Sequence, residues 1–295
     1  MSRSEPSYDL RALFKAIGQF RAYRGLDSSP TERERADAPV EMIESRPSKV
    51  EDVPLVVAGF LDGIQATLCV THREQRPVYL YYVASAVLGD KAVVEGVREH
   101  LGLVCSDKDR VWAESISAGV PVETLSEDTP PELERAASRL ISLARDGLER
   151  ALIEDLLDQD CGRIVLDGSL MGRRDDERLV GVIKTTSRQW LEDESVLWGL
   201  KEGWRSPVFK IIGRGDTPNR YSCYVQMTDK SASAWNTGLI RLEAFDPELL
   251  GPLAARCLSE RQGQLSKDPR WDRHLGSVRV VEEFLRARRP AVFSL

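Results

Sequence analysis

Cysteine is scarce in this sequence and is not spaced as a zinc site or a disulfide framework requires. The 295 residues include five cysteines, an odd number, and no two of them are separated by two residues. Cys-x-x-Cys pairs are the usual mark of zinc-binding segments and of dithiol redox sites. The pattern therefore argues against both kinds of site and favours a reducing compartment.

Long apolar runs are missing as well. No stretch approaches the roughly 18 apolar residues that a membrane-spanning helix needs, and the first residues, MSRSEPSYDLRALFKAIG, contain no apolar signal core. We therefore expect a soluble, cytoplasmic protein with no membrane contact. With 42% hydrophobic residues, a chain of this length can bury a large core, and we predict a single domain over 1–295.

The sequence also has no excess of positive charge, and its formal net charge is −6. That balance argues against a protein that coats nucleic acid nonspecifically, since such binding rests on many phosphate contacts. Basic segments at 171–178, 214–220 and 286–290 could still contact nucleic acid locally. Ordinary solvated loops and a helix end would produce the same segments.

The apolar segments that are present follow both strand and helix patterns, as in a mixed α/β domain. Residues 1–50 are predicted to form an amphipathic helix over 8–24 and a polar loop, and the core is predicted over 53–295. Predicted strands cover 54–61, 66–72, 77–87, 163–170, 179–186, 206–213, 219–227 and 236–245. The first three are closely spaced and form an antiparallel meander. Predicted helices cover 91–101, 130–162, 187–202, 246–262 and 271–289.

Two of the apolar strands run into Asp-Gly. Asp62 lies in LVVAGFLDGIQ (55–65), and Asp167 lies in RIVLDGSL (163–170). Asp-Gly is also a strong hairpin signal, so Asp62 could equally mark a turn. The segment after Asp167 is too long for a two-residue turn. Because the apolar residues of RIVLDGSL do not alternate with polar ones, this strand is predicted to be central and covered on both faces.

The order of the elements favours a ribonuclease H-like mixed sheet flanked by helices, with an N-terminal helix and insertions. Such a domain begins with a three-stranded meander, passes through a helix and returns to a strand beside the first. Its site takes an acid from the first strand, a glutamate from the helix, an aspartate from the fourth strand, and an acid or histidine near the C-terminus. The chain offers Asp62, a glutamate of the long helix, Asp167 and His274 in that order.

These side chains suit a site for two divalent ions. Mg²⁺ and Mn²⁺ prefer hard oxygen ligands, and two ions roughly 3.5–4 Å apart can activate water and stabilise the leaving oxygen of a phosphodiester. Carboxylates about 4 Å apart repel by roughly 4 kcal/mol at an effective dielectric near 20, unless cations or shared protons are present. Glu149 and Glu154 both lie in the half of the long helix nearest the central strand, and helical spacing does not decide between them.

Together these motifs resemble those of the NurA nucleases, ribonuclease H-like enzymes that partner the HerA translocase in DNA end processing. The matching segments are FLDGIQ (60–65), GLERALIEDLLDQDCGRIVLDGSL (147–170), LVGVIKTT (179–186), YSCYVQM (221–227), TGLIRLEAF (237–245) and DPRWDRHLGSV (268–278). The resemblance runs from about residue 53 to the last residue, and it lies in the order and spacing of the motifs. The first motif departs from the common Asp-Gly-Ser, because Ile64 follows Gly63, and segments 25–50 and 104–130 have no counterpart.

The resemblance implies that Asp62, Glu149 and Asp167 bind metal and that His274 completes the site. It implies that Lys184 contacts phosphate or holds the geometry of the site. It also implies a preference for Mn²⁺ (or Mg²⁺), exonuclease activity on DNA with some endonuclease activity, a homodimer, and docking to a hexameric HerA-type ATPase.

Simpler interpretations stand beside these roles. His274 could cap the helix that follows it or lie at the surface, and Lys184 could be a solvated lysine at a strand end. Tyr221 and Tyr224 could stack on the bases of a single strand, although tyrosines in such strands more often pack in the core.

Two other functions stay open beside a metal-dependent DNA nuclease. One is a catalytically inactive adaptor with the same fold that binds a translocase or DNA. The other is a sugar or acetate kinase, which shares the core. The segment DGIQAT lacks the Asp-x-Gly-Thr/Ser phosphate loop of those kinases, and 295 residues are few for their duplicated domain.

Overall fold

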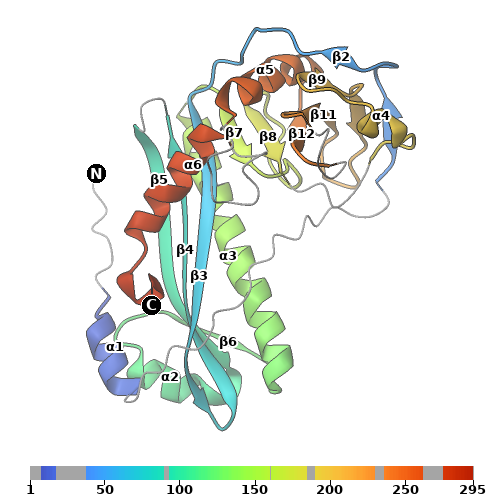
Figure 1. Cartoon of the computed structure of the whole chain (residues 1–295). Helices are drawn as coiled ribbons and strands as arrows, with labels where there is room; N and C mark the ends of the chain where they lie inside the picture. The colour runs from blue at the N-terminus through green and yellow to red at the C-terminus, as the bar shows by residue number, and fades with distance from the viewer. Residues whose placement is uncertain are drawn as a thin grey trace.

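The computed structural model describes residues 8–17, 38–89, 93–159, 161–184, 190–229, 236–261 and 275–294. Within these ranges the strands form one twelve-stranded mixed sheet, and helices pack against both of its faces (Figure 1). The mixed α/β class predicted from the sequence is therefore confirmed.

The sheet has a parallel centre and mostly antiparallel flanks, with one further parallel pair of strands at its edge. Its strands are β1 (Val40–Met42), β2 (Ser48–Lys49), β3 (Gly59–Arg73), β4 (Arg76–Leu88), β5 (Val94–Ser106), β6 (Val122–Leu125), β7 (Ile164–Asp167), β8 (Leu179–Ile183), β9 (Trp204–Arg205), β10 (Phe209–Ile211), β11 (Arg220–Gln226) and β12 (Leu239–Ala244). Their order is β1-β10-β11-β12-β8-β7-β3-β4-β5-β6, with β9 paired to β2 and β11 beside this path. Strands β3, β7 and β8 run parallel at the centre, whereas β4 is antiparallel to both of its neighbours, and β5 and β6 form the parallel pair at the edge.

The first two predicted strands, 54–61 and 66–72, belong to one continuous strand, β3. The chain turns only at Glu74 and Gln75, where φ is 47° and 70°. Asp62 therefore lies inside a strand, and the hairpin interpretation of Asp62-Gly63 is wrong. A long strand is possible here because β3 pairs with β4 from Phe60 to Arg73, with a single register shift near Cys69.

The helix predicted at 91–101 is wrong, because the residues from Val94 onward form β5. Leu101, Leu103 and Cys105 pack into one core cluster, while Val104 packs into another on the opposite face. This period of two is that of a strand. Pairing with β4 along the length of β5 outweighs the helical spacing of the sequence.

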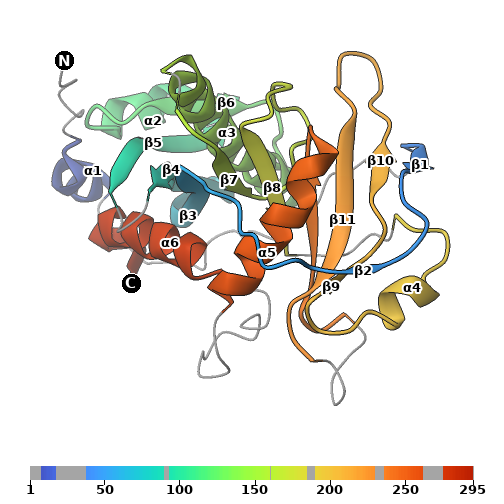
Figure 2. The same cartoon turned by 90° about the horizontal axis from the view of Figure 1, so that it is seen from above.

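Helices cover the two faces of the meander. The 29-residue α3 (Pro130–Asp158) packs against β3, β4 and β5 on one face. On the other face α6 (Gly276–Arg288) packs against β3 and β4, and α5 (Leu250–Glu260) packs against β11 and β12 (Figure 2). Helix α3 begins at residue 130, as predicted, and Asp246 accepts a hydrogen bond from Glu248 N at the turn before α5.

The remaining helices are short. They are α1 (Leu10–Ile17), α2 (Arg110–Ile116) and α4 (Ser195–Trp198). The predicted helix at 187–202 is wrong in extent: of its described part only α4 is helical. The backbone N–H of Trp190 donates a hydrogen bond to the Tyr224 hydroxyl at 3.1 Å, and this tertiary contact replaces a helical one.

The polar segment predicted as a loop over 25–50 contains two short strands in its described part. Strand β1 pairs with β10, and β2 pairs with β9. Glu44 fixes this segment, because its carboxylate accepts hydrogen bonds from the Arg205 guanidinium and from Val208 N. Among the described helices, none combines the length and the apolar character that crossing a membrane requires.

Candidate functional site

Asp62 and Asp167 lie at neighbouring positions on adjacent parallel strands. The register between β3 and β7 pairs Gly59 with Ile164, Phe60 with Val165, and Leu61 with Leu166. The next position in this register is Asp62 beside Asp167. Because side chains at paired positions of parallel strands leave the sheet on the same side, the two carboxylates share one face.

That face is the one covered by α5 and α6. Phe60 and Val165, two residues before each aspartate, pack into the same core cluster as residues of α5 and α6. Burial raises the pKa of Asp62 well above its usual range, and the charge of Asp167 adds to this rise. Asp167 is thus close enough to disfavour the ionised form of Asp62.

Lys184 is the cation that faces this pair of acids. Its Nζ donates a hydrogen bond to Asp167 Oδ2 at 2.8 Å, and its side chain is 13% exposed. Lys184 comes directly after β8, the parallel strand next to β7. The charge of Lys184 also lowers the pKa of Asp62, against the effects of burial and Asp167. The interpretation of Lys184 as a solvated strand-end lysine does not fit this contact.

Glu149 approaches from the other face, on α3, and reaches the sheet at Gly63. A Cβ atom added to Gly63 would collide with Glu149 Oε1 and lie 3.2 Å from Arg145 Cγ. The absence of a side chain at Gly63 therefore gives the glutamate its place beside Asp62. The charge of Glu149 raises the pKa of Asp62, although less than burial and Asp167 do.

Two arginines hold the Glu149 carboxylate. Arg173 Nη2 donates a hydrogen bond to Glu149 Oε2 at 2.7 Å, and Arg145 Nε lies 3.5 Å from Glu149 Oε1. The side chain of Glu149 is 13% exposed, and burial raises its pKa above the usual value while both arginines act against that rise. The alternative ligand Glu154 is 41% exposed and pairs with Arg174, one of the more exposed arginines, so it is not directed to this site.

The loop after Asp167 is fixed by a buried acid of β12. Glu243 Oε2 accepts hydrogen bonds from Ser169 Oγ at 2.8 Å and from Leu170 N at 2.7 Å. Its Oε1 accepts hydrogen bonds from Arg220 Nε and from an Arg241 nitrogen. Burial alone would raise the pKa of Glu243, but the two arginines lower it to about 2.

Close packing of the backbone also shapes this loop. Gly168 has a φ of 149°, a conformation that favours glycine. Gly181 of β8 leaves room for the loop, because a Cβ there would lie 2.6 Å from Gly168 O. The Asp-Gly-Ser-Leu motif therefore places Asp167 by packing and by the Glu243 contacts.

Sequence reasoning missed three residues of this arrangement: Arg145, Arg173 and Glu243. The i, i+4 spacing of Arg145 and Glu149 on a helix was a local signal for their ion pair. Arg173 belongs to the basic segment 171–178, but nothing in the sequence pairs it with Glu149. Glu243 contacts residues more than seventy positions away, and no local pattern predicts such a contact.

The predictions for His274 and for the two tyrosines of β11 have different outcomes. His274 lies outside the described residues; Leu275, the next residue, is buried in the core. Tyr224 is fully buried and stacks on Phe209 with ring centroids 5.9 Å apart, so it packs in the core and is not available to bases. Tyr221 is half-buried against the main core cluster.

The carboxylates have the chemistry to bind a divalent cation, but Asp167 and Glu149 already form ion pairs with Lys184 and Arg173. Within the described ranges, no three His, Cys, Asp or Glu side chains are grouped closely enough to hold a metal ion. Asp62 and Asp167 nevertheless supply hard, partly desolvated oxygens at one point. Gln65 Oε1 and Ser85 Oγ, at positions adjoining Gly63, are buried with no hydrogen-bond partner and add neutral oxygens on the α3 side.

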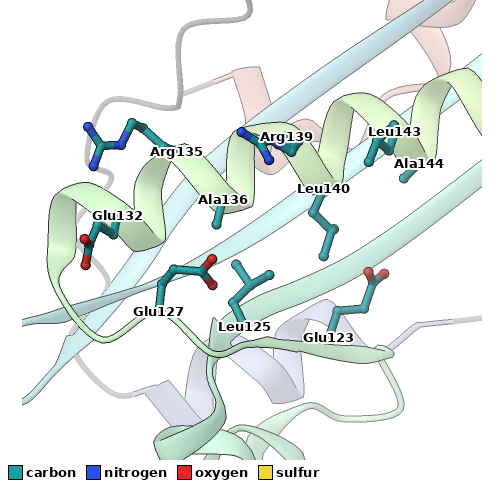
Figure 3. Close-up of a pocket in the computed structure, with 10 residues that line it drawn as sticks. All are labelled: Glu123, Leu125, Glu127, Glu132, Arg135, Ala136, Arg139, Leu140, Leu143 and Ala144. Atoms are coloured by element: carbon teal, nitrogen blue, oxygen red, sulfur yellow. The ribbon is translucent and has the colours of Figure 1, made fainter.

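One hollow of the described surface lies away from these acids. It measures about 720 Å³ and separates the first half of α3 from the edge strand β6 (Figure 3). Ala136 and Leu140 are directed toward Leu125 across it, and both strand and helix sides carry charged residues. None of the three candidate acids lines this hollow.

A search of protein-family models found none that matches this chain, and a search of curated proteins found no match. The site must therefore be interpreted from its own geometry.

Proposed function

We propose that the protein is a divalent-metal-dependent DNA nuclease with a ribonuclease H-like core. The observation that carries this proposal is the placement of Asp62 and Asp167 side by side on parallel strands, with Glu149 in the space at Gly63, the residue after Asp62. Carboxylates are crowded in this way where a cation is to be bound, since otherwise they repel one another.

The topology supports the proposal. An antiparallel meander, β3 to β5, is followed by α3 and then by β7, which returns beside β3. This is the succession of elements expected for a ribonuclease H-like domain. The acids stand on the first strand, on the following helix and at the end of the returning strand, the positions at which such a domain carries its site.

Each residue of the site has its own role in this proposal. Asp62 and Asp167 would hold the metal, joined by Glu149, and the bound metal supplies a water of lowered pKa and stabilises negative charge on phosphate oxygens. Lys184 orients the Asp167 carboxylate, because its Nζ lies 2.8 Å from Asp167 Oδ2. Glu243 holds the loop that carries Asp167. Half-burial of the acids limits the access of bulk water to the reacting phosphate.

The finer parts of the proposal come from the resemblance to NurA nucleases. They are Mn²⁺ in preference to Mg²⁺, exonuclease with some endonuclease activity, a homodimer, a hexameric HerA-type ATPase as partner, and a cytoplasmic role in DNA end processing, repair or phage defence. His274 is retained in this proposal as the residue that completes the site.

Hydrolysis of linear DNA by the purified protein tests the proposal. The wild type is expected to cut labelled duplex in Mn²⁺ and not in EDTA. Asp167→Asn should reduce the rate by at least about a hundredfold, because it removes one charge from the metal-binding pair. Equal cutting by the wild type and Asp167→Asn, or none by the wild type at any Mn²⁺ concentration, would refute it.

A second candidate is an inactive adaptor of the same fold. It is favoured by the ion pairs of Asp167 with Lys184 and of Glu149 with Arg173, which leave two of the three acids already neutralised. Binding of DNA without cutting in Mn²⁺, and without an effect of Asp167→Asn, is the result that this alternative predicts.

A further inference from the structure

Basic side chains of the protein itself face the acids of the candidate site. The acids Asp62, Glu149 and Asp167 are met by Lys184, Arg145 and Arg173. A divalent cation adds two positive charges beside these basic side chains. Such an ion therefore binds more tightly if one of the basic side chains withdraws from its carboxylate.

Arg173 is the least constrained of the three. It lies in the loop between β7 and β8, whereas Arg145 is fixed on α3 and pairs with Asp146 as well as Glu149. The described contacts of the Arg173 guanidinium are its 2.7 Å bond to Glu149 and a 3.5 Å contact of Nη1 with Asp146 O. One strong hydrogen bond thus holds an arginine that is 11% exposed.

We propose that Arg173 competes with the divalent cation for Glu149, and that the guanidinium released by metal binding takes up a phosphate oxygen of the DNA. This inference rests on the proposed nuclease function. The carboxylate that Arg173 holds is the third acid of the candidate site. A guanidinium released from it suits a phosphate, which it can bind through two parallel N–H donors.

The neighbouring arginine is a matched control. Arg174 has the same charge and lies in the same loop, but it pairs with Glu154 and Asp158, two exposed acids on the far end of α3. Removing either arginine changes the net charge by one unit. Only the removal of Arg173 takes a hydrogen bond away from Glu149.

The test is Mn²⁺ binding in the absence of DNA, measured by the loss of the free-Mn²⁺ electron paramagnetic resonance signal. Arg173→Ala is expected to bind Mn²⁺ about three- to tenfold more tightly than the wild type, since it loses one competing charged hydrogen bond. Arg174→Ala should bind as the wild type does. In a Glu149→Gln background, Arg173→Ala should have no effect, because the contested carboxylate is gone.

Unchanged or weaker Mn²⁺ binding by a folded Arg173→Ala protein would overturn the inference and leave the nuclease proposal standing. If the wild type itself binds no Mn²⁺, the nuclease proposal fails instead. Circular dichroism establishes that each variant is folded.

DNA binding with Ca²⁺ in place of Mn²⁺ tests the second half of the proposal. The plot of log affinity against log salt concentration should be shallower for Arg173→Ala by about one phosphate contact, and unchanged for Arg174→Ala. Equal slopes for Arg173→Ala and the wild type would show that Arg173 does not take up phosphate.

Discussion

Single residues set the electrostatics of the candidate site. Asp62 is disfavoured as an anion by burial and by its neighbour Asp167, and Gly63 allows a third acid to approach through the missing side chain. Such an arrangement stores unfavourable free energy in the folded protein, which a bound cation would recover. Sites built for binding commonly reduce stability in this way.

Asp62→Asn is therefore expected to stabilise the protein in metal-chelating buffer by about 1 kcal/mol, because it removes the repulsion and keeps a similar shape. The measurement is urea denaturation at neutral pH with EDTA. Asp175→Asn is the control: Asp175 is exposed in the same loop as Arg173, and its change should alter the free energy of unfolding by less than about 0.5 kcal/mol. A loss of stability in Asp62→Asn would contradict the account of the site.

Glu243 should make stability depend on acid pH. Its pKa is lowered to about 2 in the folded protein, from an ordinary value of 4.5. The unfolded chain therefore binds the proton more readily, so this stabilisation is present above pH ~4.5 and is lost as the pH falls toward 2. The difference corresponds to on the order of 3 kcal/mol.

Glu243→Gln tests this dependence. The variant should be less stable than the wild type by about 3 kcal/mol at pH 7, because two buried arginines lose their counter-charge. The gap between the two proteins should narrow as the pH is lowered toward 2, in denaturation curves recorded at several pH values. A gap that is constant with pH would show that the Glu243 charge is not the cause.

At the scale of elements, α3 carries Glu149 to the sheet and spans the meander. Its 29 residues include Gly147, an exposed position where an added Cβ would meet nothing within 4 Å. Gly147 therefore does not serve close packing. Its only effect is to lower the stability of the helix two residues before Glu149.

Gly147→Ala should stabilise the protein by about 0.5–1 kcal/mol, the usual gain for an exposed helical position. Gly96→Ala is the opposite case, since its Cβ would lie 2.6 Å from a Leu152 side-chain carbon of the same helix. The two variants should shift the midpoint of chemical denaturation in opposite directions. A destabilised Gly147→Ala protein would show that this position needs a glycine for another reason.

The sequence predicted the elements whose signals are local. The long helix α3 and the apolar strand ending at Asp167 were both predicted. Strand β5 was missed because it depends on pairing with β4, a contact between two separate segments. The apolar residues within the segment itself have helical spacing. Short strands such as β1 and β2 were missed for the same reason, since they are only two or three residues long and their partners are distant in the sequence.

The candidate site was predictable in part. Asp62 and Asp167 were singled out because each follows apolar residues and precedes glycine, and the register of β3 and β7 places them together. The contacts of Arg173 with Glu149 and of Ser169 with Glu243 join residues 24 and 74 positions apart. Such long-range contacts depend on the order of the strands in the sheet, which the sequence did not predict in detail.

At the scale of the whole molecule, the candidate site lies where the two parts of the sheet meet. The meander β3 to β5 lies on one side of β7, and β8 with β12, β11 and β10 lies on the other (Figures 1 and 2). Asp62 comes from the first part, Lys184 and Glu243 from the second, and Asp167 from the strand between them. A cation held there would join the two parts and should stabilise the folded chain as a whole.

The central claim is that Asp62 and Asp167 share a divalent cation, and anomalous diffraction from crystals grown with Mn²⁺ tests it most directly. The account predicts an anomalous peak in contact with both carboxylates, with Glu149 turned away from Arg173 toward the ion. A peak elsewhere, or none, with Asp167 still paired to Lys184 and Glu149 still paired to Arg173 at saturating Mn²⁺, would contradict it.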